Sequence, residues 1–220
     1  GGWLLATNGD GLREAGEVED LARADVRVLV AGDSHTYGVC NNDESFPNRI
    51  EAALRDRHPE RSIEVLNAAT DGFSFFQYAG LLNKYRDFDP QVFVVAVYGG
   101  NDFIEMAGLA HHFDGTRMPD WEREDYALRD RALRVAPTAM GQGFNAIQWF
   151  RKQPQEIAAM IATAVELCEE MQAVCLARRI AMVVVYLPSP ADFAWPDGNL
   201  ALERAARELG VTTEERRINE

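Results

Sequence analysis

Three short polar segments contain the residues of this chain that could do chemistry together. Gly32-Asp33-Ser34 offers a serine hydroxyl, Ala69-Thr70-Asp71-Gly72 offers a glycine N–H, and Gly99-Gly100-Asn101-Asp102 offers an asparagine amide. A serine hydroxyl is a nucleophile for acyl transfer, and N–H donors stabilise the oxyanion that forms when it attacks a carbonyl. The three segments therefore predict an acyl-transfer site, with the serine as nucleophile and the glycine and asparagine as oxyanion donors.

Each polar segment follows an apolar run that we interpret as a strand. The runs cover residues 26–31 (VRVLVA), 63–68 (IEVLNA) and 92–98 (VFVVAVY), and a fourth covers 180–187 (IAMVVVYL). Such continuously apolar strands are typical of a parallel sheet that helices cover on both faces. Ligands of these sheets bind beyond the carboxyl ends of the strands, so we expect the three segments to meet at one edge.

Helical patterns lie between the strands. Apolar residues at helical spacing predict one helix near residues 46–54, with Ser45 placed to cap it, and a long helix over 157–175. A third pattern covers residues 200–209 and ends at Gly210. Strands that alternate with helices imply right-handed crossovers and an α/β fold of three layers.

The domain organisation follows from the one long interruption of this alternation. The stretch from about 103 to 155 is rich in charged, aromatic and glycine residues, and it separates the third strand from the long helix. We interpret it as an insertion over the active-site edge. Residues 1–220 are thus expected to form a single domain.

Composition excludes several classes of partner. The net charge of −13 argues against nucleic acid, which needs a basic surface. No apolar run has the length of a membrane span. The three cysteines show neither a disulfide framework nor zinc spacing, so free thiols are expected.

Several common motifs are absent from the sequence. It lacks G-x-S-x-G, the nucleophile elbow of the α/β-hydrolases. It also lacks G-x-G-x-x-G, the P-loop and H-E-x-x-H. We therefore expect neither a cofactor nor a metal.

The three polar segments, taken together, resemble the conserved blocks of the SGNH hydrolases, also called the GDSL-like lipase/acylhydrolase family. The likeness covers residues 26–98 and the Asn101 loop, and it includes the run GVCNNDESFPNRIEAAL after Ser34. It implies a flavodoxin-like α/β/α sandwich in which Ser34 is the nucleophile and a donor to the oxyanion, and Gly72 and Asn101 are further donors. Asp33 and Asp102 would support the site, Asp102 by holding its loop through backbone hydrogen bonds.

One part of the family pattern is missing. The family has an Asp-x-x-His block near its C-terminus, which supplies the base and the carboxylate that orients it, and no such pair occurs here. The only histidines are His35, His58, His111 and His112, and none has the position in the chain that this role requires. We expect the base and a last strand to lie in a segment beyond residue 220.

The resemblance implies a serine ester hydrolase that acts on an acetylated carbohydrate, a short-chain ester or a lipid ester. Two alternatives stay open: a non-catalytic binding module with the same fold, and an acyltransferase. The opening WLLATNGDGLR is similar to the lead-in of exported or membrane-attached family members, which favours an extracytoplasmic location.

Overall fold

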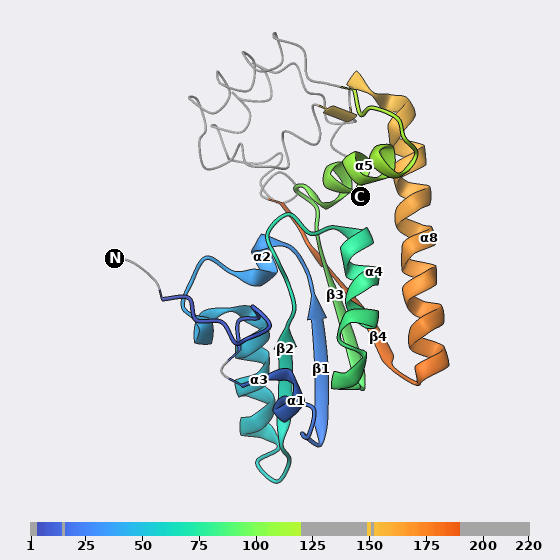
Figure 1. Cartoon of the computed structure of the whole chain (residues 1–220). Coiled ribbons are helices and arrows are strands. Elements are labelled where there is room, and N and C mark those ends of the chain that lie inside the picture. The colour runs from blue at the N-terminus through green and yellow to red at the C-terminus, as the bar shows by residue number, and fades with distance from the viewer. Residues whose placement is uncertain (1–3, 15, 120–148, 151, 190–220) are drawn as a thin grey trace, which may run out of the picture. The chain divides into compact units, whose positions relative to one another are not determined.

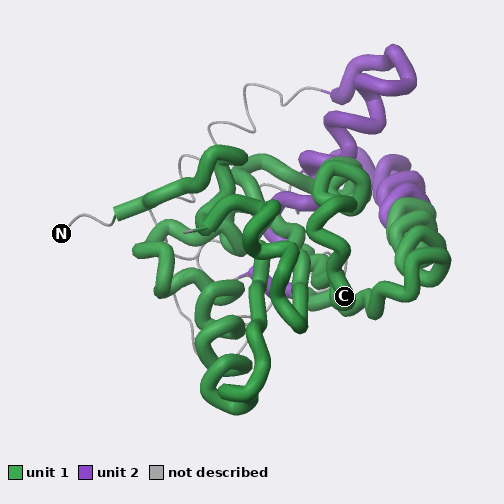
Figure 2. Tube along the Cα trace, turned by 60° about the horizontal axis from the view of Figure 1, so that its bottom comes forward, with its two compact units in different colours: residues 1–97, 165–186 green, residues 98–164, 187–220 purple. Residues whose placement is uncertain are grey.

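The computed structural model describes residues 4–14, 16–119, 149–150 and 152–189. The chain divides into two compact units (Figure 2). The first, in green, contains residues 1–97 and 165–186, and the second, in purple, contains residues 98–164 and 187–220. The predicted insertion falls in the second unit. The helix expected over residues 200–209 lies outside the described residues.

A four-stranded parallel sheet forms the centre of the first unit (Figure 1). Its strands are β1 (Val26–Ala31), β2 (Ile63–Asn67), β3 (Val92–Tyr98) and β4 (Ala181–Leu187). Their order is β2-β1-β3-β4. This is how the first four strands of a flavodoxin-like sheet are arranged, and the predicted α/β fold is confirmed.

Helices cover both faces of the sheet. The structure has α1 (Val18–Leu21), α2 (Ser34–Tyr37), α3 (Phe46–Arg57), α4 (Phe75–Lys84), α5 (Asp102–Phe113) and α8 (Pro154–Arg178), with 3-10 turns at Asn42–Glu44 and Arg86–Phe88. Phe46 and Leu54 of α3 pack against one face, on the cluster of Val28, Val30 and Val65. Figure 1 shows α4 on the opposite side of the sheet.

On the opposite face, β1, β2 and β3 are also buried. Leu29, Leu66 and Phe93 alternate with the residues that face α3, and none of the three has any exposed surface. At the end of α8, the Arg178 guanidinium donates to the carbonyl oxygens of Leu82 and Arg86, so α8 and α4 lie side by side there. The three layers are therefore α3, the sheet, and α4 with α8.

The strand bounds agree with the apolar runs, but the expected burial of the fourth strand is wrong. Val184 of β4 is 53% exposed, and Val183 and Tyr186 are also exposed. The reason is the strand order, because within the described residues β4 has a neighbour only on its β3 side. An apolar sequence allows a strand to be buried. Whether the strand is buried depends on its position in the sheet.

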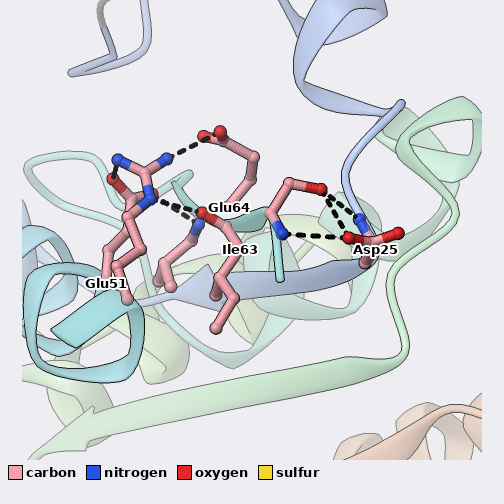
Figure 3. Close-up of polar contacts among 7 residues, drawn as sticks. Asp25, Glu51, Ile63 and Glu64 are labelled. Carbon is pink, nitrogen blue, oxygen red and sulfur yellow. Dashed lines mark hydrogen bonds and ion pairs between the residues drawn. The ribbon is translucent and has the colours of Figure 1, made fainter. Parts of the chain in front are cut away.

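The other edge of the sheet is closed by side chains (Figure 3). On the outer side of β2, the Glu51 carboxylate accepts the Val65 N–H at 2.8 Å, and Arg55 Nε donates to the Ile63 oxygen at 2.8 Å. Arg55 also forms ion pairs with Glu51 and Glu64. These contacts occupy the backbone groups that a further strand would need.

The predictions for the start of α3 and for the buried stripe of α8 agree with the structure only in part. Ser45 does hold the N-cap position of α3, but its hydroxyl donates to Asn48 Oδ1 at 2.7 Å and caps no helix N–H. The buried stripe of α8 includes Met160, Ala164 and Met171 as expected, whereas Ile161 is 49% exposed. Within the described ranges, no helix combines the length and apolar character needed to cross a membrane.

Candidate functional site

Ser34 lies where the sequence places it, directly after the carboxyl end of β1. It is half-buried and is the first residue of α2. Asp33 is fully buried at the N-cap of this helix, and its Oδ1 accepts the His35 N–H at 2.9 Å. A Cβ on Gly32 would lie 2.1 Å from Thr36 Oγ1, so this turn requires glycine. The serine is thus held by a sharp, tightly packed turn.

The Gly72 loop is joined to the Ser34 loop within the first unit. The Thr70 N–H donates to the Gly32 oxygen at 3.2 Å, and the Ala68 N–H donates to the Val30 oxygen at 3.0 Å. Gly72 has a φ of +74°, a backbone conformation that favours glycine, and no atom lies within 4 Å of a Cβ built on it. Gly72 is therefore exposed, with open space beside its Cα.

Asn101 and Asp102 belong to the second unit. Asn101 is the N-cap residue of α5 and is 5% exposed, and its Nδ2 donates to Glu105 Oε1 at 2.6 Å. A primary amide has two N–H groups, so one remains for a ligand. Asp102 is fully buried, and its Oδ2 accepts the Tyr98 N–H at 2.8 Å, a backbone hydrogen bond of the kind predicted for it.

Three of the four histidines have polar contacts with residues other than Ser34. His35 Nδ1 lies 3.1 Å from Asp33 Oδ2. His58 follows the last residue of α3, and its Nδ1 lies 3.7 Å from Glu60 Oε1, as expected for a histidine away from the site. The ring nitrogens of His111 contact Thr116 Oγ1 at 2.8 Å and Glu156 Oε2 at 3.2 Å.

The aromatic residues after Gly72 form the start of α4. In this position, Phe75, Phe76 and Tyr78 could either wall an acyl pocket or pack in the core beneath it. Phe75 and Tyr78 are buried, with ring centroids 6.1 Å apart, and the Tyr78 hydroxyl donates to the Phe73 oxygen. These contacts place the two rings in the core of the first unit.

Two charged residues of this region were not identified from the sequence. Arg13 has no exposed surface and Glu14 is 8% exposed. Burial raises the pKa of Glu14 from 4.5 to about 7, and Glu51 and Glu64 add to this, while the hydrogen bond from the Asn67 N–H opposes it. No local pattern marks either residue, because their partners lie far along the chain.

Comparisons with protein-family models, with curated proteins and with solved structures find no significant match to this chain. The functional interpretation therefore depends on the site residues themselves.

Proposed function

We propose that this chain provides the nucleophile and oxyanion donors of a serine ester hydrolase. The observation that carries the proposal is the turn at Ser34. A half-buried serine follows a central parallel strand, and a hydrogen bond joins its turn to the loop that contains the exposed Gly72. A serine and backbone donors at the carboxyl ends of neighbouring strands are what acyl transfer requires.

In the proposed reaction, the Ser34 oxygen attacks the carbonyl carbon of an ester and gives its proton to a base. The alcohol leaves with a proton, and water then hydrolyses the acyl-enzyme to release the acid. Gly72 and Asn101 donate N–H groups to the oxyanion. We propose that the base is a histidine outside these 220 residues, in the Asp-x-x-His block that the family resemblance implies.

A second candidate is a non-catalytic binding module with the same site, which the contacts of both His111 ring nitrogens with Thr116 and Glu156 favour. The two differ in whether Ser34 reacts. The experiment is hydrolysis of a short-chain aryl ester by this chain, and by the chain extended through the natural C-terminus of its gene. The matched variants are Ser34→Ala and Ser62→Ala, since Ser62 lies at the start of β2, away from the carboxyl ends of the strands.

The hydrolase proposal predicts that the extended protein is active, that Ser34→Ala abolishes this activity, and that Ser62→Ala keeps it. The 220-residue chain should be far less active, because a serine without a base is a weak nucleophile. An extended protein as inactive as its Ser34→Ala variant would favour the binding module. An acyltransferase would give more ester product than acid when a sugar acceptor is added.

A further inference from the structure

Arg13 and Glu14 are consecutive charged residues buried in the first unit. Arg13 is fully buried, and 8% of Glu14 is exposed. A charge removed from water is costly unless polar partners surround it. The hydrogen-bond partners of Arg13 and Glu14 therefore show which parts of the chain these two residues hold in place.

Arg13 binds the chain directly after the Ser34 helix. Its guanidinium donates to the backbone oxygens of Tyr37, Gly38 and Cys40, and its Nε donates to Asn42 Oδ1 at 3.2 Å. The last carbonyls of a helix lack partners within the helix, and a cation at this end is favoured. One planar side chain thus fixes the end of the short helix that Ser34 begins.

Glu14 binds the start of the second loop. Its Oε1 accepts the N–H of Asn67, the last residue of β2, at 2.8 Å. Asn67 in turn accepts the Ala69 N–H on its Oδ1 at 3.3 Å and donates from Nδ2 to the Thr36 oxygen at 3.4 Å. The segment that leads to Gly72 is therefore tied both to Glu14 and to the Ser34 helix.

We propose that Arg13 and Glu14 are positioning residues of the acyl-transfer site, which hold the Ser34 and Gly72 loops at a fixed separation. The inference rests on the proposed function, because it concerns the geometry between nucleophile and oxyanion donor. A displacement of about 1 Å at a reacting atom can cost on the order of 100-fold in rate. Anchoring both loops on adjacent residues of one segment limits such displacement.

The test measures how fast an aryl fluorophosphonate labels Ser34 in the extended protein, with the maximal rate constant and the half-saturating concentration determined separately. Arg13→Lys keeps the charge but loses the planar fork, and Glu14→Leu removes the acceptor. Glu14→Gln keeps a carbonyl oxygen for Asn67. Arg23→Lys is the control, because the side chain of Arg23 is 80% exposed.

We expect the maximal rate constant to fall about 10- to 100-fold in Arg13→Lys and Glu14→Leu, with little change in half-saturation. Glu14→Gln should restore the rate to within about threefold, and Arg23→Lys should match the parent, because neither change removes an anchor. A merely structural role would lower the melting temperature of Arg13→Lys and Glu14→Leu and leave the maximal rate constant unchanged. Unchanged maximal rates in both variants would overturn the inference.

Hydrogen exchange separates the inference from the proposed function. If the extended protein is not labelled at Ser34, the proposed hydrolase fails, and exchange in residues 34–40 and 68–72 then tests the anchors alone. Faster exchange confined to these segments in Arg13→Lys and Glu14→Leu would support the positioning role. Exchange equal to that of the parent would refute it.

Discussion

The Asp33 Oδ2 atom lies 3.1 Å from Nδ1 of His35. The Nδ1 side of this histidine, which follows the candidate nucleophile Ser34, is therefore directed toward Asp33. The same oxygen of Asp33 is 3.5 Å from Ser34 Oγ. The buried carboxylate therefore contacts both of the residues that follow it. This arrangement orients the imidazole through its Nδ1.

We predict that His35→Gln changes the rate of Ser34 labelling by no more than about threefold, because glutamine can still donate to Asp33. Removing the true base of a serine hydrolase costs on the order of 10⁶ in turnover. The measurement is fluorophosphonate labelling of the extended protein, with Ser34→Ala as the blank. A loss of a thousandfold would identify His35 as the base.

Asn101 gives the second prediction. In the extended protein, Asn101→Ala should lower turnover by about 10²–10³, the usual effect of losing one oxyanion donor. Asn101→Asp has the same shape without the N–H groups and should be as harmful. Glu105→Gln is the control, because glutamine still offers an oxygen to Asn101 Nδ2. Steady-state turnover of an aryl ester is the measurement, and an unchanged value would remove Asn101 from the mechanism.

The sheet could be predicted from the sequence because its signals are local. Val26–Ala31 and Val92–Tyr98 are apolar runs bounded by polar residues, and the strands have the same bounds. The position of Ser34 after the first strand follows from the same runs. The number of neighbours of a strand depends on the whole topology, and an apolar run alone does not indicate the exposure of Val184.

The anchors of the site could not be predicted, because their partners are distant in the chain. Arg13 binds carbonyl oxygens 24 to 27 residues away, and Glu14 binds an N–H 53 residues away. In the sequence they are two ordinary charged residues in a polar segment. Only the fold reveals that they are buried, and only their backbone partners connect them to Ser34.

The two edges of the sheet lead to a third prediction, on association. Glu51 and Arg55 close the β2 edge, whereas β4 exposes Val183 and Val184. An uncovered apolar edge favours pairing with other chains, and a lysine there opposes it. Val184→Lys should therefore slow aggregation of the chain on heating, even though it makes the net charge less negative.

Light scattering during a temperature ramp measures this effect. Gln155→Lys adds the same charge at an exposed position of α8, outside the sheet. It should leave the aggregation rate unchanged or raise it slightly, because the net negative charge decreases. Equal slowing in both variants would attribute the effect to charge and not to the β4 edge.

The last prediction concerns the dependence of stability on pH through Glu14. Its pKa is 4.5 when unfolded and about 7 when folded, raised mainly by burial. Between these values the folded protein holds a proton that the unfolded chain has released. The stabilisation from Glu14 is therefore fully present below pH 4.5 and is lost as the pH rises through about 7.

Glu14→Gln isolates this contribution, because glutamine does not titrate and still accepts from the Asn67 N–H. One pKa unit corresponds to about 1.4 kcal/mol, so the parent should lose on the order of 3 kcal/mol relative to the variant across this range. Urea denaturation in steps of one pH unit measures the difference in the free energy of unfolding, and other titrating groups cancel because both proteins contain them. Glu60→Gln, at an exposed position, should follow the parent at every pH. Parallel curves for the parent and Glu14→Gln would mean that Glu14 titrates alike in both states, and that it is not buried as a neutral acid beside Asn67.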